Sequence, residues 1–204
     1  MSRIKRNGQL LVHLIDEILD LSKIELGGLQ VEKTELNLSE LISDVSSIIQ
    51  DKAEKKGLLF FMSVDGPLPY TCLSDPIRFK QILLNIIGNA VKFTVKGEVK
   101  VLVKSTPANS KLHIVVSDTG IGIASEQVNK LFQPFSQADI AIAHQYGGTG
   151  LGLVISRKLA RALGGDVVLV ESKQGVGSTF EITVGLESAK YTKYHKIQQG
   201  YFQP

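Results

Sequence analysis

The sequence predicts an α+β domain, a two-layer sandwich with helices on one face of a sheet, preceded by one separate helix at the N-terminus. Segments with helical period alternate with short apolar segments that suit strands. Two pairs of these strand segments are adjacent in the chain, which favours antiparallel neighbours and one mixed sheet layer. With 204 residues, 43% of them apolar, the chain can form one well-cored domain and an appendage.

The N-terminal segment predicts a helix with partners. From about Arg3 to Leu26 apolar residues recur at three- and four-residue steps, and Gly27-Gly28 predicts where the helix ends. The stripe is wide, comprising Ile4, Leu10, Leu11, Leu14, Ile15, Ile18, Leu19 and Leu21. It suits a helix bundle, and the alternative is an ordinary helix packed on its own domain. Its acidic residues argue against a signal peptide and a membrane span.

The remaining elements follow in order, each bounded by caps or turn residues. We expect a short strand at 29–37, then a helix at 38–57 capped by Asn37 or Ser39, then a strand at 58–65. A turn-rich link, 65–72, precedes a helix at 74–94 with Pro76 in its first turn. A hairpin (97–106 and 111–118), a short helix, a long helix (148–165) and a strand pair (166–172 and 178–185) complete the domain. The expected division is therefore a partial bundle at 1–28, a main domain at 29–187 and a linker or disordered tail at 188–204.

Composition excludes some classes of function. Lys and Arg number 23 against 20 Asp and Glu, and the net charge of +3 is not gathered in a basic block, so we expect no nucleic-acid partner. The single cysteine, Cys72, cannot form an internal disulfide, which fits a reducing compartment or a small buried hydrophobe.

Three polar residues of the 74–94 helix share one face. The core face of this helix is expected to carry Phe79, Ile82, Leu83, Ile86, Ala90 and Phe93. Asn85, Asn89 and Lys92, spaced i, i+4, i+7, fall together beside it. Amide oxygens suit a hard cation such as Mg²⁺ and an ammonium suits phosphate. The pattern therefore predicts a metal and phosphate site, although a single such asparagine would more often be only solvated.

Two glycine-rich segments add to this picture. Asp118 ends a strand and runs into Gly120 and Gly122, where a ligand can approach the backbone closely, although this pattern alone is a common turn. The segment Tyr146–Leu153 leads from glycines into a helix N-terminus, which favours phosphate. It is neither a P-loop, since no Gly-Lys-Ser/Thr occurs, nor a Rossmann fingerprint.

Between the two glycine segments lies 124–145, a short helix followed by a stretch without clear period. A connection of this length in a compact domain is usually functional, so we expect a lid over a ligand. Phe132 and Phe135 are expected to anchor the near end of that lid, and the alternative is that both are plain core aromatics.

Four segments in this order resemble the N, G1, F and G2 boxes of histidine kinases: NIIGNAVKFT, DTGIGI, FQPFSQAD and GGTGLGL. The set is similar to the GHKL ATPase superfamily, and KFT and QPFSQAD resemble the forms found in histidine kinases, often hybrid ones. LIDEILDLSKIELGGLQVE is similar to the second helix of their dimerisation domain and its exit. The resemblance covers roughly residues 3–186 and implies the Bergerat sandwich, a mixed sheet covered by about three helices.

The resemblance also implies roles for individual residues. Asp118 would bind the adenine amino group, with Gly120 and Gly122 beside it, Asn89 would ligate Mg²⁺, and Asn85 and Lys92 would act at the ATP phosphates. The remaining nucleotide-binding residues implied are Gly148, Gly150, Leu151, Gly152, Thr179, Phe93 and Tyr146.

The implied function is a cytoplasmic protein histidine kinase that uses ATP and Mg²⁺. Its implied partners are a phosphoacceptor histidine of its own dimerisation domain, a response regulator or fused receiver domain, and a second copy in a homodimer. No histidine of this sequence is followed by an acidic residue as the family acceptor is, so we expect the acceptor to lie outside the chain.

Another departure from the family pattern leaves alternatives open. Where hybrid kinases commonly carry a basic pair before the lid tyrosine, this chain has His144-Gln145. This departure keeps open a degenerate ATP-binding regulatory module without phosphotransfer. A clamp ATPase of another GHKL class is a separate alternative, and the N-terminal bundle helix and the KFT and QPFSQAD forms argue against it.

Overall fold

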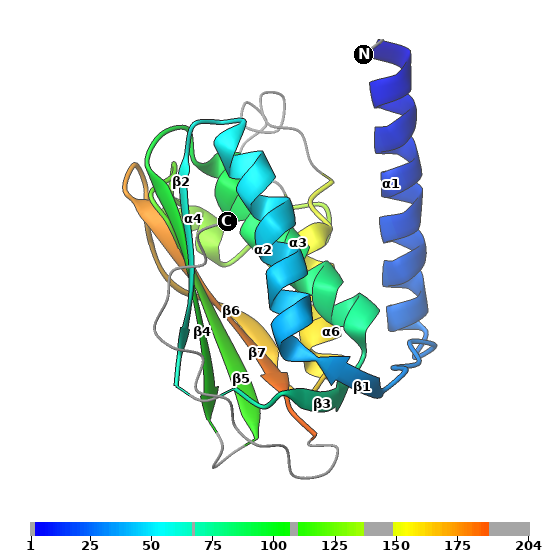
Figure 1. Cartoon of the computed structure of the whole chain (residues 1–204). Helices are drawn as coiled ribbons and strands as arrows, with labels where there is room; N and C mark the ends of the chain where they lie inside the picture. Colours follow the sequence, from blue (N-terminus) through cyan, green and yellow to red (C-terminus); the bar gives the residue numbers. More distant parts are fainter. Residues whose placement is uncertain (1–2, 67, 107–109, 137–148, 188–204) are drawn as a thin grey trace.

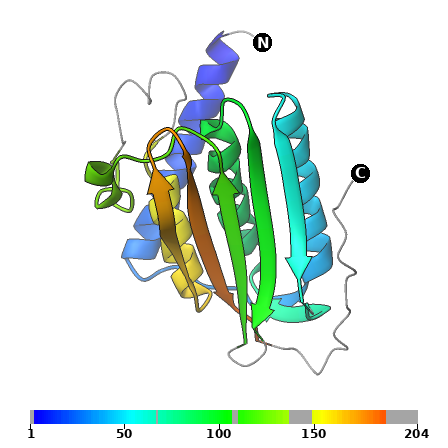
Figure 2. The ribbon, with the colours of Figure 1, turned by 90° about the vertical axis from the view of Figure 1, so that its left-hand side faces the viewer.

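The computed structural model describes residues 3–66, 68–106, 110–136 and 149–187, and helices cover one face of its main sheet (Figure 1). Three helices cover that face: α2 (Leu38–Glu54), α3 (Pro76–Phe93) and α6 (Gly152–Ala162). Figure 2 shows the sheet in front of these helices. The predicted α+β two-layer sandwich is confirmed.

The main sheet has five strands in the order β2-β4-β5-β7-β6. Their bounds are β2 (Leu59–Asp65), β4 (Glu98–Thr106), β5 (Lys111–Asp118), β6 (Asp166–Lys173) and β7 (Gly177–Gly185). β2 pairs with β4 in parallel and all other neighbours are antiparallel, so the sheet is mixed. The predicted hairpin, β4 with β5, and the predicted strand pair, β6 with β7, are both present.

A second, two-stranded sheet differs from the sequence prediction. β1 (Thr34–Asn37) pairs antiparallel with β3 (Thr71–Ser74). The strand expected over 29–37 is therefore only its last part, and part of the expected turn-rich link is a strand. The strand β3 was not predicted from the sequence because it is short and forms through pairing with β1, a distant segment of the chain. Pairing of that kind leaves little local pattern in the sequence.

Local capping explains the helix boundaries. Asn37 caps α2, because its side chain accepts hydrogen bonds from the backbone N–H groups of Ser39 and Glu40. Asp75 caps α3 in the same way, with Pro76 in the first turn. The N-terminal helix α1 (Arg3–Glu25) ends just before Gly27, which adopts a φ of 70°. A short helix, α4 (Ser125–Val128), follows the G1-like segment.

The core lies between the sheet and the three helices. The predicted apolar face of α3 is buried at Phe79, Ile82, Leu83, Ile86 and Ala90. Phe93 is only half-buried, contrary to its assignment to the core face, because it is the last residue of α3 and lies where the chain leaves the helix. The lone cysteine, Cys72, is buried.

α1 stands outside the three helices, and its C-terminal part packs on them (Figure 1). Leu21 is buried there, Arg78 Nη1 donates to Asp20 at 3.3 Å, and Lys158 Nζ donates to Glu25 at 3.4 Å. The division at residue 28 remains a prediction, and the proposed tail at 188–204 lies outside the described residues. Among the described residues, no helix is long and apolar enough to span a membrane.

Candidate nucleotide-binding site

The polar face of α3, defined as Asn85, Asn89 and Lys92, is present as the sequence predicts. Asn89 Nδ2 donates to Asn85 Oδ1 at 3.4 Å, and Asn85 Nδ2 donates to Ser156 Oγ of α6 at 2.7 Å. All three side chains are half-buried. Because each amide nitrogen is engaged within the protein, the orientation of both amides is fixed, and the oxygen of Asn89 is directed away from its donor contact.

Lys92 supplies the positive charge of this face. Its ammonium lies 4.8 Å from the centroid of the Phe93 ring. Burial lowers the pKa of Lys92, while the carboxylate of Glu17 on α1 acts in the opposite direction. A partly desolvated ammonium interacts more strongly with an anion than one in water, so this position suits a phosphate group.

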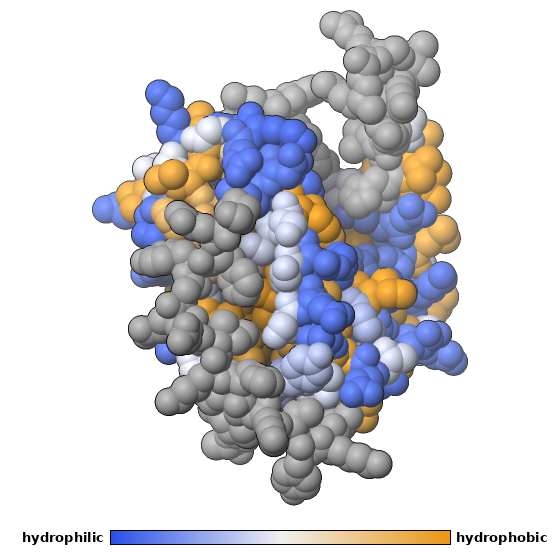
Figure 3. Space-filling view, in the orientation of Figure 1, coloured by the Kyte–Doolittle hydropathy of each residue, from blue (hydrophilic) through white to orange (hydrophobic). Residues whose placement is uncertain are grey.

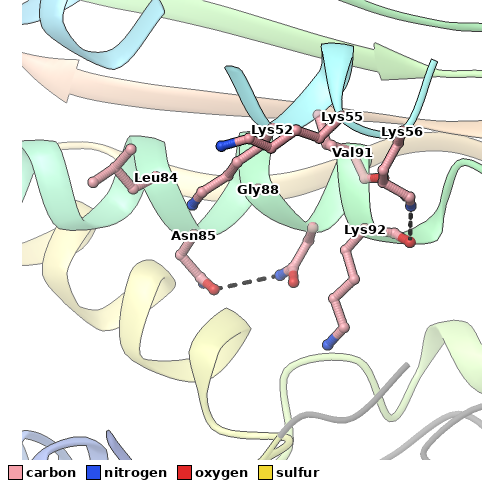
Figure 4. A pocket seen from close by; sticks show the side chains of 9 residues that line it. Lys52, Lys55, Lys56, Leu84, Asn85, Gly88, Val91 and Lys92 are labelled. Atoms are coloured by element: carbon pink, nitrogen blue, oxygen red, sulfur yellow. Dashed lines mark hydrogen bonds between the residues drawn. The ribbon is translucent and has the colours of Figure 1, made fainter. Parts of the chain in front are cut away.

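The polar face opens onto a groove between α2 and α3 with a volume of about 460 Å³. Figure 4 shows Lys52, Lys55 and Lys56, at and just after the end of α2, on one side of α3, and the side chains of Asn85 and Lys92 extending from α3 away from them. The lining residues are Lys52, Lys55, Lys56, Leu84, Asn85, Gly88, Asn89, Val91 and Lys92. The lysines make one side of this groove basic.

Asp118 lies at the end of β5, on the helix-covered side of the sheet. Leu112, Ile114 and Val116 are buried on that side, and the strand period of two carries it to Asp118. The carboxylate accepts the Gly120 N–H at 2.8 Å. Burial raises the pKa of Asp118, although the backbone N–H groups of Gly120 and Ser178 act to lower it. A desolvated carboxylate held in this way can accept a hydrogen bond from a ligand.

The glycines after Asp118 are required by close backbone contacts. A Cβ on Gly120 would lie 2.6 Å from the Phe93 carbonyl oxygen, and one on Gly122 would lie 2.0 Å from that of Lys173. Ile121 N–H donates to the same Phe93 oxygen at 3.3 Å. The C-terminal end of α3 is thus fixed against the segment that follows Asp118, which places the polar face and the Asp118 carboxylate in one region.

The glycine turn before α6 completes the described site. Gly150 has a φ of 74°, and a Cβ there would lie 3.1 Å from the Phe135 carbonyl carbon. A Cβ on Gly152 would lie 2.6 Å from Asn85 Oδ1, so only glycine lets the first turn of α6 approach the polar face. Leu151, between the two glycines, is fully buried and precedes the helix. The free N–H groups of this helix start therefore adjoin Asn85, as a phosphate site requires.

Thr179 is not brought to Asp118. Its Oγ1 lies 3.0 Å from Ser117 Oγ, and Ser117 precedes Asp118, so this pair lies on the opposite face of the sheet. Ser178 is paired with Asp118 across the two strands and is buried on the helix-covered side. Counting by twos back from the buried Ile182 would have selected Ser178 from the sequence.

The two lid aromatics behave differently. Phe132 is half-buried against the core, and the guanidinium of Arg157 lies 4.5 Å from its ring centroid. Phe135 is 64% exposed, so only Phe132 anchors this segment through its side chain. The segment's contacts to Arg157 were not predicted, since they join residues far apart in the chain. Tyr146, Gly148 and His144, together with the rest of the expected lid at 137–148, lie outside the described residues.

Comparison with known proteins places the site described above within a known family of ATPases. Residues 74–188 match the family model of the histidine kinase-, DNA gyrase B- and HSP90-like ATPases. This chain belongs to that ATPase family. The matched region contains the polar face of α3, the Asp118 segment and the Gly150 turn, so every described site residue lies within the ATPase domain.

Within this ATPase family, the chain is similar to sensor proteins and histidine kinases. The chain is 41% identical over 200 residues to the sensor protein GacS of Pseudomonas syringae pv. syringae, which covers 97% of the chain and 22% of GacS. It is 38% identical over 190 residues to the signal transduction histidine-protein kinase BarA of Escherichia coli K12, covering 92% of the chain and 21% of BarA. The chain therefore spans about a fifth of the length of these relatives.

Solved structures of histidine kinases have a fold similar to that of this chain. Full-length ShkA in complex with AMPPNP superposes with a TM-score of 0.78 at 30% identity, covering 90% of this chain and 37% of ShkA. The histidine kinase ThkA, in complex with the response regulator protein TrrA, gives a TM-score of 0.65 at 28% identity, covering 89% of this chain and 49% of ThkA. The chain thus carries the ATP-binding domain found in histidine kinases.

Proposed function

We propose that this chain is the catalytic part of a sensor histidine kinase, which transfers the γ-phosphoryl group of ATP to a histidine outside the chain. The observation that carries the proposal is the convergence of the polar face of α3 with the Gly150 turn, through the Asn85–Ser156 hydrogen bond and the close approach of Gly152. The similarity to GacS and BarA over nearly the whole chain supports it.

We assign the adenine to the Asp118 end of the sheet. The carboxylate would accept the hydrogen bond of the adenine amino group, and the burial that raises its pKa provides a partly dry site for a base. Ser178 takes the place expected for Thr179, because it lies on the same side of the sheet as Asp118. The binding of AMPPNP by ShkA supports placing an adenine nucleotide here.

We assign the phosphates to the polar face of α3 and the start of α6. Lys92, Asn85 and the backbone N–H groups after Gly150 would bind phosphate oxygens, with Gly152 keeping that backbone close. Asn89 would be the protein ligand of Mg²⁺, since its Nδ2 donates to Asn85 and its oxygen is the atom suited to a hard cation. Mg²⁺, when bound, would neutralise phosphate charge.

The chain's own residues would act mainly by positioning. Phosphoryl transfer requires alignment and charge stabilisation more than covalent help from the protein. Lys92 supplies a desolvated cation, the helix start supplies aligned N–H donors, and Asp118 fixes the other end of the nucleotide. The attacking imidazole would come from the phosphoacceptor histidine of the dimerisation domain.

The partners proposed are a second copy of the chain and a response regulator or fused receiver domain. Leu11, Val12, Ile15, Ile18 and Leu19 of α1 are each at least 44% exposed, which supports a helix bundle formed with another chain. Figure 3 shows hydrophobic residues along the outer edge of α1. The ThkA–TrrA complex supports a response regulator as partner, and the use of ATP supports a cytoplasmic location.

A degenerate regulatory module is the second candidate. The observation in its favour is His144-Gln145, where related hybrid kinases carry a basic pair. Such a module would bind ATP without transferring phosphate.

A transfer assay separates these functions. The chain is mixed with a dimerisation domain of a close relative that carries its phosphoacceptor histidine, together with ATP labelled at the γ-phosphate. We expect acid-labile label on that histidine, none on the chain itself, and none when Asn89→Ala replaces the wild type. Binding without transfer would support the regulatory module, and steady release of free phosphate would support a clamp ATPase.

A further inference from the structure

Arg157, in the second turn of α6, joins two parts of the domain that are far apart in the sequence. Its guanidinium carbon lies 4.5 Å from the centroid of the Phe132 ring. Arg157 Nε donates to Asp166 Oδ1 at 3.0 Å, and Nη2 donates to Oδ2 at 3.4 Å. The carboxylate of β6 therefore holds the guanidinium plane in place while its face contacts the aromatic ring.

The anchor for this arrangement is an ionised carboxylate. Burial acts to raise the pKa of Asp166, but hydrogen bonds from Arg157, Arg161 and the Val167 N–H outweigh it and hold the pKa below its ordinary value. Arg161 donates to the same two oxygens at 3.2 and 3.1 Å. Two arginines thus share one acceptor, and Arg157 is the one described over Phe132.

The same turn of α6 also contacts the polar face of α3. Ser156, the neighbour of Arg157, accepts the hydrogen bond from Asn85 Nδ2 at 2.7 Å. Beyond Phe132, the backbone of Phe135 and Ser136 lies against Gly150, so closely that a Cβ there would be 3.1 Å from the Ser136 carbonyl oxygen. The segment 131–136 is therefore held to α6 at its start by Arg157 and to the glycine turn at its end.

We propose that Arg157 is a positioning residue for nucleotide binding, which holds the segment 131–136 against the Gly150 turn through its contact with Phe132. The proposal rests on the nucleotide site proposed above and extends it. Arg157 acts through Phe132 and the backbone of the turn, and not by contact with the nucleotide. A purely structural role would consist of the ion pair with Asp166 alone, and Arg161 has that ion pair as well.

Arg161 therefore provides a matched control. Arg157→Met and Arg161→Met each remove one arginine from Asp166, but only the first removes the cation from Phe132. We expect Arg157→Met to weaken Mg-ATP binding about two- to fivefold more than Arg161→Met, which is the scale of one partly exposed cation–π contact. Adenosine affinity is expected to be equal in the two variants. Calorimetry measures both.

Phe132→Leu tests whether Arg157 acts through the Phe132 ring, because leucine keeps much of the bulk of the side chain but offers no aromatic face. We expect it to weaken Mg-ATP binding as Arg157→Met does, and the double variant to be no weaker than either single variant. Additive losses would show that the two residues act separately, and equal losses in Arg157→Met and Arg161→Met would show that the ion pair alone matters. Either result overturns the proposal.

Trypsin cleavage after the exposed Lys130 gives a readout that needs no nucleotide. If Arg157 holds this segment, Arg157→Met should speed cleavage at Lys130 about two- to fivefold, because the segment opens more often when the cation–π contact is lost. Arg161→Met should leave the cleavage rate unchanged. Fragment masses identify the cut. A wild-type chain that binds no ATP would refute the proposed function but leave this comparison decisive for Arg157, and unchanged cleavage in both variants would refute the positioning role.

Discussion

At the scale of single residues, the site depends on polar groups that are partly removed from water and held by fixed partners. Asp118 shows this most clearly, because burial raises its pKa while two backbone N–H groups still hold the carboxylate in place. The ionised form is therefore costly in the folded chain without a ligand. A ligand that donates a hydrogen bond to this carboxylate reduces that cost.

Asp118→Asn should separate binding from stability. An amide can present a donor where the adenine amino group requires an acceptor, so ATP affinity should fall by about 1–3 kcal/mol. Because asparagine avoids burying a charge, we expect the melting temperature of the ligand-free variant to be at least that of the wild type. Calorimetry and thermal unfolding test the two parts, and unchanged affinity would contradict the adenine assignment.

The pH dependence of stability follows from the same raised pKa. A carboxyl whose pKa is higher in the folded than in the unfolded chain binds its proton more tightly when folded, so it stabilises the fold at low pH. Its contribution to the free energy of unfolding should decrease as pH rises from the ordinary value of 3.8 to the raised value. Subtracting the stability curve of Asp118→Asn from that of the wild type isolates this trend, and a difference that does not change over this pH range would contradict it.

Asn89→Ala should affect the metal and phosphates and not the base. We expect the variant to lose most of the gain in ATP affinity that Mg²⁺ provides to the wild type, while adenosine binding stays unchanged. Titrations with and without Mg²⁺ give this comparison. Asn89 also donates to Asn85, so the melting temperature must be measured, and equal weakening of ATP and adenosine would mean that Asn89 is only structural.

At the scale of elements, α3 is held at both ends, which fixes the polar face between them. Asp75 caps its N-terminus through the N–H groups of Ile77 and Arg78. At the C-terminus, Lys56 Nζ donates to the carbonyl oxygens of Val91, Lys92 and Thr94 at 2.7, 2.9 and 2.9 Å. A cation placed at the negative end of the helix satisfies carbonyls that have no partner within the helix.

Lys56→Met should therefore destabilise the domain where Lys55→Met does not. We expect Lys56→Met to lower the free energy of unfolding by about 1 kcal/mol, which is typical of charge-assisted hydrogen bonds at a partly exposed helix end. Lys55 is a matched control because its ammonium pairs with Asp51 on the exposed surface of α2, where an ion pair contributes little. Urea unfolding measures both, and equal losses would show that the carbonyl contacts contribute nothing specific.

At the scale of the whole molecule, α1 has two different sides. One side contacts the ATPase domain through Leu21, through Asp20 with Arg78 and Gln81, and through Glu25 with Lys158. The other side carries the exposed apolar residues of the predicted stripe. The chain can thus hold its ATPase domain against α1 while α1 offers an apolar surface to a further helix.

Replacing apolar residues of that surface should abolish self-association. We expect the wild-type chain to form dimers at high concentration and the variant Ile15→Gln/Leu19→Gln to remain monomeric, because both side chains are about half exposed and contribute apolar area only to a partner. Light scattering after gel filtration measures the mass. ATP affinity should be unchanged in the variant, and a wild type that stays monomeric at all concentrations would contradict the bundle assignment.

The sequence by itself determined the parts of this protein that depend on local pattern. Hydrophobic period placed α2, α3 and α6 and both antiparallel strand pairs, since a buried face must repeat with the period of its element. The same period gave the polar face of α3, because Asn85, Asn89 and Lys92 share a face in any α-helix. The glycines after Asp118 and before α6 were predicted to let a ligand approach the backbone, which stays a prediction, and the structure shows that Gly120, Gly122, Gly150 and Gly152 lie close to other parts of the chain itself.

The tertiary structure decided what depends on pairing between distant segments. The β1–β3 sheet, the contact of Arg157 with Phe132 and the capping of α3 by Lys56 each join residues that no local pattern relates. It also decided that Ser178 lies directly opposite Asp118 across β5 and β7, because the register between two strands is set by their pairing. Local pattern fixes which face a residue takes within its own element, and only packing fixes what that face meets.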